Sequence, residues 1–532
     1  MVREESSPPP FDGSPIILSR IRAAYHERVT GFVRTWGGPV AVTLIAGVIR
    51  FVGLGTPSTL VFDETYYVKD AYSMLNLGYE GAWPEGADAR FTSDSVDIFT
   101  SAPAYIAHPP LGKWIIGLGL QVFGAEDPFG WRVSTALLGT LAVALLCVIA
   151  YALFRSPTLA TLAGFFLAID GLAITMSRTA LLDNSLMFVT LLGFGAVLLD
   201  RRQSAERLAG WMLQREKRGL SVDWGPALWW RPWLVTAGLL FGLAAGIKWS
   251  GIYFLAVFAV YTLFVDACAR RRAGVSFWAT SVLLKQAPVS FLLTVPIAAL
   301  AYVSTWAGWL VTRGGYDREW AENRVASGGD DIVPGIPLAI QSLWHYHQAI
   351  YETNLGLATP HAYQANPLGW LAMIRPTAFY YRGTSEGELG CSIQSCSEYV
   401  TSVANPLLWY LAVAAAVYLV YRLIRRREWR VGLILTGVAA GYLPWLLYTE
   451  RTVFQFYTIV FLPYLILGFV FVLGLVLAPE SGDAHRRAVG VRFVIVLVGA
   501  ITIVSVFFYS AWTGLQVSGL YQQLHYWLPS WR

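Results

Sequence analysis

Two adjacent carboxylates, Asp63 and Glu64, are the residues of this sequence best suited to acid–base chemistry. They lie in a polar segment that follows the first long apolar run. Neighbouring side chains on a helix or a strand point in different directions, so one acid can face a substrate while the other faces a structural partner. An acid in that position could act as a general base on a hydroxyl nucleophile. The alternative from these residues alone is a solvated pair that caps a helix.

Cations near the ends of apolar runs form the second candidate group. An ionisable side chain at membrane depth is costly, so each of these cations is a candidate functional residue. Gathered on one face near a carboxylate pair, they would suit an anionic, lipid-linked substrate, because a phosphate leaving group needs positive charge where its own charge develops. The alternative for Lys113 is a side chain that snorkels to the membrane surface. The predicted phosphate-binding residues are Lys113, Arg132, Arg178, Lys248 and Arg451.

Three further polar residues are predicted to support this site. His108 precedes two prolines at the entry of a short apolar run, and Asp183 and Glu450 each lie close in sequence to a cation. The structural alternative is that Asp183 pairs with Arg178 and Glu450 with Arg451. Both interpretations stay open on the sequence alone.

Histidines and aromatic residues crowd the polar stretch 344–370. His345 and His347 are two residues apart, which favours one face of a strand over one face of a helix. As a metal site the pattern is weak, because no further ligand has a telling spacing. We expect no obligatory metal and no cofactor, since fixed cations can neutralise a phosphate. The Trp and Tyr side chains suit sugar faces and membrane interfaces equally.

The composition requires a membrane as solvent for much of the chain. Of 532 residues, 55% are hydrophobic and 14% are charged, whereas a soluble domain carries about 25% charged residues. The net charge of +5 comes from basic clusters between apolar runs. That placement follows the positive-inside rule and does not indicate nucleic-acid binding.

Eleven apolar runs are predicted to span the membrane, since a spanning helix needs roughly 17–25 apolar residues. The short run 111–123 is predicted to be interfacial or re-entrant, because counting it as a span would move the basic cluster 201–218 outside. All basic clusters then lie in the cytoplasm, with the N-terminus inside and the C-terminus outside. The predicted spans are 38–54, 131–153, 158–176, 184–199, 233–248, 250–266, 284–308, 404–422, 431–447, 455–477 and 491–510.

The predicted fold class is an all-α polytopic membrane protein with two large outer loops. Cys391 and Cys396 share the second loop and could form a small disulfide if that loop lies outside the cytoplasm. The predicted parts are a cytoplasmic tail 1–37 with a disordered Ser/Pro-rich start, a catalytic membrane module 38–308 that includes the outer loop 55–130, an outer loop 309–403, membrane helices 404–510 and an outer tail 511–532.

Five segments, in order and with matching spacing, make the chain resemble the protein O-mannosyltransferases in a bacterial form. The resemblance covers roughly residues 35–510. The segments are Phe62-Asp63-Glu64, His108-Pro109-Pro110-Leu111-Gly112-Lys113, Trp131-Arg132 followed by Ser134, Ser177-Arg178 with Leu181-Leu182-Asp183, and Lys248-Trp249-Ser250-Gly251.

The resemblance implies a GT-C glycosyltransferase fold and transfer of mannose from polyprenyl-phosphate mannose to Ser or Thr of translocated proteins, with inversion. The catalytic acid of that family carries over to Asp63, and its second acid and an important Arg carry over to Glu64 and Arg132. The second outer loop has no room for the β-trefoil domain of eukaryotic relatives. Expected partners are the lipid-linked donor, an acceptor polypeptide at the secretion translocon, and membrane lipid, at a cell-membrane site that faces away from the cytoplasm.

Two other functions compete with this one. A GT-C transferase could move a lipid-linked sugar to a glycolipid acceptor, and only the acceptor would distinguish it. A membrane transporter would show internal repeats and helices broken at the midplane. We find no such repeats in the sequence, and the polar residues gather on one face.

Overall fold

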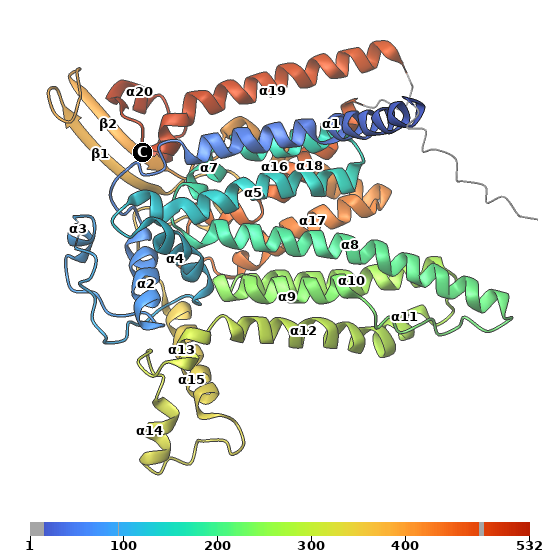
Figure 1. Ribbon diagram of the computed structural model, residues 1–532, viewed down its shortest axis with the longest axis horizontal. Coiled ribbons are helices and arrows are strands. Elements are labelled where there is room, and N and C mark those ends of the chain that lie inside the picture. Colours follow the sequence, from blue (N-terminus) through green and yellow to red (C-terminus); the bar gives the residue numbers. More distant parts are fainter. Residues whose placement is uncertain (1–14, 94, 478–482) are drawn as a thin grey trace, which may run out of the picture.

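The structure is a computed structural model that describes residues 15–93, 95–477 and 483–532. Long helices run side by side along one axis, and shorter helices and the strands gather at one end of the bundle (Figure 1). We call this the loop end, because it is built mainly from residues 55–127 and 305–403. The opposite end is called the basic end.

Eight helical segments among the described residues are long and apolar enough to cross a membrane, or nine if α6 and α7, which are bent by 63°, form one span. Shorter apolar helices cover the other predicted runs, so the number of eleven spans stays a prediction. The bundle helices are α1 (Pro15–Phe51), α5 (Pro128–Phe154), α6 (Pro157–Ile169), α7 (Gly171–Ser177), α8 (Leu182–Lys217), α9 (Pro232–Ile247), α10 (Gly251–Arg272), α11 (Trp278–Ser281), η1 (Val282–Gln286), α12 (Ala287–Ser304), α16 (Pro406–Arg426), α17 (Trp429–Tyr442), η3 (Leu443–Leu447), η4 (Gln455–Val460), α18 (Leu462–Leu477) and α19 (Ala484–Thr513).

Several bundle helices start at a capping residue followed by proline. Asp127 accepts a hydrogen bond from the Phe129 amide, Ser156 from the Leu159 amide and Asn405 from the Leu408 amide, and Pro occupies the next position each time. A polar N-cap satisfies an otherwise unpaired amide, and proline fits the first helical turn. These local signals fix where α5, α6 and α16 begin.

The first helix is longer than predicted. It begins at Pro15, so residues 15–37, which we predicted as a tail, are helical. Proline fits the first turn of a helix, so Pro15 suits the position at which this helix begins. The Ser/Pro-rich start at residues 1–14 lies outside the described residues.

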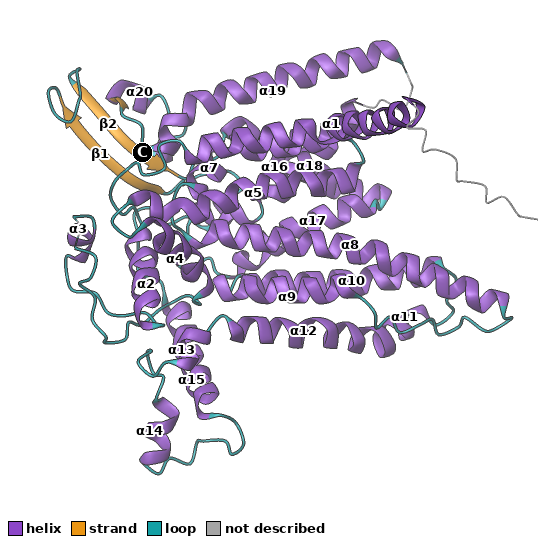
Figure 2. Cartoon of the chain, viewed as in Figure 1, coloured by secondary structure: helices purple, strands orange, loops and turns teal. Residues whose placement is uncertain are grey.

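The loop end holds short helices and, among the described residues, all the strands (Figure 2). The sheet has the order β1-β2-β3, and both pairings are antiparallel. Cys391 and Cys396 are bridged near the hairpin tip, with Cα atoms 5.8 Å apart, as we predicted they could be. The elements are α2 (Glu64–Leu77), α3 (Ala87–Phe91), α4 (Leu111–Phe123), α13 (Ala307–Val311), α14 (Trp320–Ala326), α15 (Leu338–Gly356), η2 (Pro367–Gly369), β1 (Ala378–Ser385), β2 (Ser395–Thr401), β3 (Val517–Ser518), α20 (Gly519–Gln523) and η5 (Pro529–Trp531).

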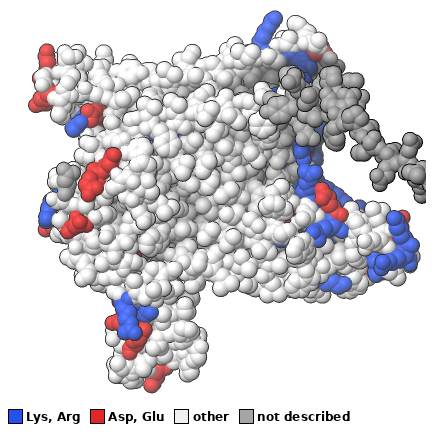
Figure 3. Space-filling model, viewed as in Figure 1, with Lys and Arg blue, Asp and Glu red and all other residues white. Residues whose placement is uncertain are grey.

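Lys and Arg side chains gather at the end of the bundle opposite the strands (Figure 3). The last turns of α8, α10 and α16 contribute Arg215, Arg271 and Arg425 among others. The predicted basic clusters of these three helices therefore share one end of the molecule. This arrangement agrees with the parity on which the predicted topology was based.

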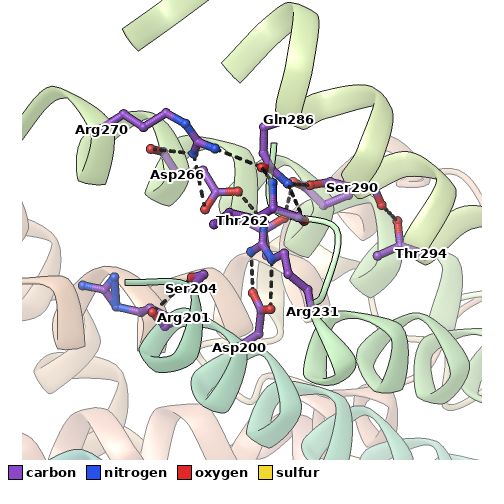
Figure 4. A network of polar contacts seen from close by, with 12 residues as sticks. Asp200, Arg201, Ser204, Arg231, Thr262, Asp266, Arg270, Gln286, Ser290 and Thr294 are labelled. Carbon is purple, nitrogen blue, oxygen red and sulfur yellow. Dashed lines mark hydrogen bonds and ion pairs between the residues drawn. The ribbon is translucent and has the colours of Figure 1, made fainter. Parts of the chain in front are cut away.

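A buried ion-pair network ties the helices together near the basic end (Figure 4). Arg231 pairs with Asp200 of α8 and with Asp266 of α10, at 2.5 Å in both cases. Arg270 donates a hydrogen bond of 2.9 Å to Gln286, at the junction with α12. Removing one partner of such a buried pair typically costs about 3–5 kcal/mol, because a charge is left uncompensated. The network thus holds α8, the start of α9, the end of α10 and the start of α12 together at the basic end.

Candidate active site

The two adjacent acids at the start of α2 point to different partners, as their spacing predicted. Glu64 is fully buried and accepts two hydrogen bonds of 2.8 Å from Arg132. It also accepts the main-chain amides of Val61 and Ala180. Its oxygens are thus fully engaged in holding the loop against α5 and the segment before α8. These bonds favour a structural role for Glu64, and its predicted catalytic role stays a prediction.

Asp63 keeps a more open environment. It stands at the N-cap of α2 without a side-chain capping bond, and its nearest hydrogen-bond donor is the Tyr67 hydroxyl at 3.5 Å. Phe62, just before it, has a positive φ of 48°. That left-handed backbone turns the chain sharply and sends neighbouring side chains in different directions. Asp63 is therefore the acid of the pair that is available for chemistry.

All N–H donors of the Arg132 guanidinium form hydrogen bonds within the protein. Besides Glu64, it donates to the carbonyls of Leu54, Pro57 and Thr59, and its side chain is fully buried. A guanidinium has five N–H donors, and these bonds occupy all of them. The predicted contact between Arg132 and a donor phosphate does not fit this geometry, because no donor is left for it.

Arg178 has a similar anchoring role at the C-terminal end of α1. Its guanidinium donates to the carbonyls of Ile49, Arg50, Val52 and Gly53. A cation there satisfies carbonyls that have no partner inside the helix and complements the helix dipole. The predicted phosphate contact of Arg178 is replaced by this cap, and its alternative pairing with Asp183 is also wrong.

Arg50, which sequence reasoning missed, completes this anchoring. It donates to the carbonyls of Leu167 and Ala168 at the end of α6 and to the Ser177 hydroxyl. A lone cation inside the first apolar run was the signal that could have found it. Together with Arg132 and Arg178 it forms a group that we call the anchored cations.

Lys113 is buried in a carboxylate pocket of its own. Its ammonium lies 2.5 Å from Glu80 and 3.5 Å from Asp70, and its side chain is only 1% exposed. The predicted phosphate contact is not supported, because two acids already compensate its charge and it does not line the main cavity. Snorkelling is excluded as well.

Lys248 lies in the turn between α9 and α10 and is held from two sides. Asp183, at the start of α8, accepts two hydrogen bonds from its ammonium, of 3.0 and 3.1 Å. The ammonium nitrogen also lies 3.8 Å from the centroid of the Tyr457 ring. Asp183 therefore holds Lys248 in place, and its predicted supporting role in the site stays a prediction. A single carboxylate leaves donors of the ammonium for a further anion, since it has three.

The main cavity has a volume of about 810 Å³ and opens next to Lys248. We call it the donor cavity. Its polar rim includes Lys248, Arg451 and His108, and its walls between α9, α10 and α12 are apolar. Representative wall residues are Gly242, Ala245, Leu255, Val295, Ala298 and Ala299.

Arg451 lines this cavity beside Asn354, to which it donates a hydrogen bond of 2.5 Å. Its Nε is buried without a hydrogen-bond partner. An unsatisfied donor on a buried guanidinium is costly, and an anionic ligand would supply the missing acceptor. Glu450 is exposed and does not line the cavity, so its predicted supporting role is not supported and its alternative pairing with Arg451 is absent from the described contacts.

The charges around the cavity set the protonation state of Asp63. Burial raises the pKa of Asp63 to about 6, the positive charge of Lys248 opposes the rise, and Asp183 adds to it. Tyr67, its hydrogen-bond donor, has its ring centroid 6.2 Å from that of His108 on the cavity rim. Burial and nearby cations lower the pKa of His108 well below its usual value. Asp63 is thus mostly ionised at neutral pH, and Tyr67 contacts both Asp63 and the neutral His108.

The histidines of the second loop lie on a helix, not on the predicted strand. On α15, His345 stacks on Trp320 with centroids 4.2 Å apart, while His347 contacts the Tyr302 hydroxyl at 2.5 Å. Successive helical positions diverge by about 100°, so residues two apart face different sides. Over the part of the chain that the structure describes, no group of three or more His, Cys, Asp or Glu side chains could hold a metal ion. Metal independence stays a prediction.

The fold and the site define a polytopic membrane glycosyltransferase of the GT-C class. The structure of the S. cerevisiae protein O-mannosyltransferase Pmt1-Pmt2 complex bound to the sugar donor is similar, with a TM-score of 0.67 over 93% of this chain and 92% of that chain. The two are 13% identical, so this likeness concerns the fold. The predicted fold class is confirmed.

Sequence comparison identifies the family within that class. Residues 40–214 match the family described as dolichyl-phosphate-mannose-protein mannosyltransferase, and residues 339–531 match the C-terminal four-helix region of protein O-mannosyltransferases. A polyprenol-phosphate-mannose–protein mannosyltransferase of Mycobacterium tuberculosis is 34% identical over 94% of this chain and 92% of the relative. Its counterpart in Mycolicibacterium smegmatis is 33% identical over 93% of each chain. The chain belongs to the protein O-mannosyltransferase family, which confirms the predicted resemblance, and it is a multi-pass membrane enzyme.

Proposed function

We propose that the protein transfers mannose from polyprenyl-phosphate mannose to Ser or Thr hydroxyls of polypeptides. The names of the mycobacterial relatives support this donor and a protein acceptor. The observation that carries the proposal is the donor cavity, whose cations lie beside a buried, ionised acid. A lipid phosphate needs cations at its head and an apolar wall along its chain, and the cavity offers both.

The proposed reaction is a single displacement. Asp63 accepts the proton of the acceptor hydroxyl as its oxygen forms a bond to C1 of the mannosyl group. The bond between C1 and the phosphate oxygen breaks, and the electron pair leaves with the polyprenyl phosphate. Attack from the side opposite the leaving group inverts the anomeric centre. One proton ends on Asp63 and one negative charge is added to the phosphate.

Lys248 and Arg451 take the role of stabilising that added charge. Both line the donor cavity, and both keep a donor that the protein does not satisfy. Fixed cations in a site shielded from water stabilise a developing charge without reorganisation at the moment of reaction. His108, kept neutral, adds a polar ring to the same rim without adding charge.

We place the loop end outside the cytoplasm and the basic end inside. The Lys and Arg side chains that gather opposite the strands support this orientation under the positive-inside rule (Figure 3). The Cys391–Cys396 disulfide supports an oxidising surrounding for the loop end. In this orientation the enzyme would meet polypeptides as they leave the secretion translocon.

The test is an assay with purified full-length protein, labelled polyprenyl-phosphate mannose and a Ser/Thr-rich peptide. Label should enter the peptide, and replacing every Ser and Thr of the peptide by Ala should abolish the incorporation. Label found in glycolipid and none in the peptide would contradict the proposal and favour a glycolipid acceptor.

A further inference from the structure

A second cavity lies at the loop end, between the β1–β2 hairpin and the C-terminal residues that follow α19. Its volume is about 250 Å³, and we call it the hairpin cavity. It shares no lining residue with the donor cavity. The aromatic residues that line it include Tyr363, Tyr380, Tyr381, Tyr399, Tyr526 and Trp531.

The C-terminal wall of this cavity is firmly held. The His525 ring contacts the Tyr399 hydroxyl at 2.6 Å and the Phe507 carbonyl at 2.8 Å. Trp531 donates a hydrogen bond of 2.7 Å to the Met373 carbonyl, and β3 pairs with β2. A wall fixed before a ligand arrives loses little entropy on binding. The hairpin cavity is therefore a built feature of the fold.

The chemistry of the lining favours an uncharged ligand that has both an apolar face and hydroxyl groups. Flat aromatic rings offer large contact areas, and the Tyr hydroxyls, Thr401 and Gln522 offer hydrogen bonds. Arg532 is the one Lys or Arg among the lining residues, and no Asp or Glu is among them. A sugar ring has this combination of C–H faces and hydroxyls.

The size of the cavity favours one ring over a length of polypeptide. Its volume corresponds to about eight water molecules at about 30 Å³ each, which is the scale of a single hexose. An extended peptide would instead need a groove several residues long, with pockets for alternate side chains. A free sugar is not expected to be the partner, because the cavity lies beside the site where polypeptide is modified.

A stack of two rings connects this cavity to the catalytic acid. Phe379 lies on β1 between the lining residues Ala378 and Tyr380 but does not itself line the cavity, and the register of β1 with β2 shifts at this point. Its ring stacks on Phe62, with centroids 5.2 Å apart, and Phe62 directly precedes Asp63. Strand β1 thus contributes residues to the hairpin cavity and also packs on the residue that precedes Asp63.

We propose that the hairpin cavity binds a mannosyl group already attached to the acceptor polypeptide and so favours further transfer to a nearby hydroxyl. The identity of the sugar rests on the proposed function. The largely aromatic lining, the size of one ring and the contact of β1 with Phe62 carry the rest.

The first test measures binding without catalysis. Saturation-transfer NMR on the full-length protein would use methyl mannopyranoside, with methyl galactopyranoside as the comparison sugar. The mannoside signal should exceed the galactoside signal, fall in Tyr380→Ala and Tyr381→Ala, and persist in Lys248→Ala. A signal that is absent from the wild type, equal for both sugars, unchanged in both Tyr variants, or lost only in Lys248→Ala would overturn the proposal.

The second test compares acceptors. We expect the KM for a peptide that carries one mannose and one free Ser, relative to the KM for the unmodified peptide, to rise about threefold to tenfold in Tyr381→Ala, the effect of losing one aromatic contact. Tyr381 is 62% exposed, so its loss should spare the fold, and Tyr421→Ala is the matched control because Tyr421 is 60% exposed on α16. An unchanged ratio in Tyr381→Ala, or an equal rise in Tyr421→Ala, would contradict the proposal. Absence of transfer to any peptide by the wild type would refute the proposed function, and the binding test would still decide the cavity.

Discussion

Cations at two places near the loop end differ in how far the protein already uses them. The anchored cations, Arg50, Arg132 and Arg178, donate to carbonyls, to Glu64 and to the Ser177 hydroxyl. The Nε of Arg178 has no hydrogen-bond partner, but none of the three residues lines the donor cavity. Lys248 and Arg451, the cavity cations, line an open volume and keep donors for a ligand. The difference indicates that a cation which keeps a donor and also lines an open cavity, rather than any cation at a helix end, is suited to bind a ligand.

The largest effect should come from breaking the anchored group. Arg132→Met leaves the buried Glu64 carboxylate without its cation and three carbonyls without their donor, a loss of about 3–5 kcal/mol in stability. We expect little folded protein by size-exclusion chromatography of the extracted membrane. Arg202→Met is the control, because Arg202 belongs to an exposed pair worth about 0–1 kcal/mol. Normal folding of Arg132→Met would show that Arg132 is not an anchor.

Removing the Lys248 charge should weaken binding of the lipid donor and leave the protein folded. Lys248→Ala combined with Asp183→Asn removes the cation without leaving a bare buried carboxylate. We expect a folded protein whose KM for the lipid donor rises about 10- to 100-fold, the value of a hydrogen bond to a charged group, with little change in the KM for peptide. Lys285→Ala, at the junction η1 near the basic end, is the control. Equal donor KM in the double variant and the wild type would remove Lys248 from the donor site.

The pH dependence sharpens the role of Asp63 itself. Because burial raises the pKa of Asp63 to about 6, it is protonated as the pH falls through that value, and a protonated acid cannot accept the hydroxyl proton. We expect kcat/KM to fall about tenfold between pH 7 and pH 5. Burial also raises the pKa of Asp70 to about 6, so Asp70→Asn is the control. The acid limb should persist in that variant, and its loss there would assign the limb to Asp70.

The hairpin disulfide should have the smallest effect on transfer. Cys391 and Cys396 close a short ring far along the hairpin from Phe379, and a loop of this length contributes about 2 kcal/mol. We expect Cys391→Ser with Cys396→Ser to lower the thermal unfolding midpoint while transfer to a singly hydroxylated peptide stays within about twofold. A loss of transfer as large as that of the Lys248 variant would show that the hairpin takes part in catalysis.

Much of the fold could be predicted because lipid imposes simple rules on sequence. Apolar runs, basic clusters and the divergence of Asp63 from Glu64 all follow from local spacing. The anchored cations could not be assigned in this way. Arg132 binds carbonyls of Leu54, Pro57 and Thr59 that lie far earlier in the chain. Because every residue has a main-chain carbonyl, the sequence does not show which carbonyls bind a side chain.

The other differences between prediction and structure also depend on local conformation or on contacts between distant segments. His345 and His347 were predicted on a strand because their spacing of two was given more weight than the helix-compatible stretch around them. The network around Arg231 was missed because Asp200 and Asp266 meet it only when three helices pack. Lys113 was assigned to the phosphate because its two acids, Asp70 and Glu80, lie in the preceding loop and helix, where their direction cannot be read from sequence.

The central claim is that Asp63 is the base and that its neighbour Glu64 is structural. The most direct measurement is the rate of labelled mannose transfer by Asp63→Asn, compared with Asp97→Asn, an exposed acid of the same loop. We predict that Asp63→Asn stays folded, binds the lipid donor as the wild type does, and transfers mannose about 10²- to 10⁴-fold more slowly, while Asp97→Asn is unaffected. Transfer by Asp63→Asn at the wild-type rate would contradict the mechanism.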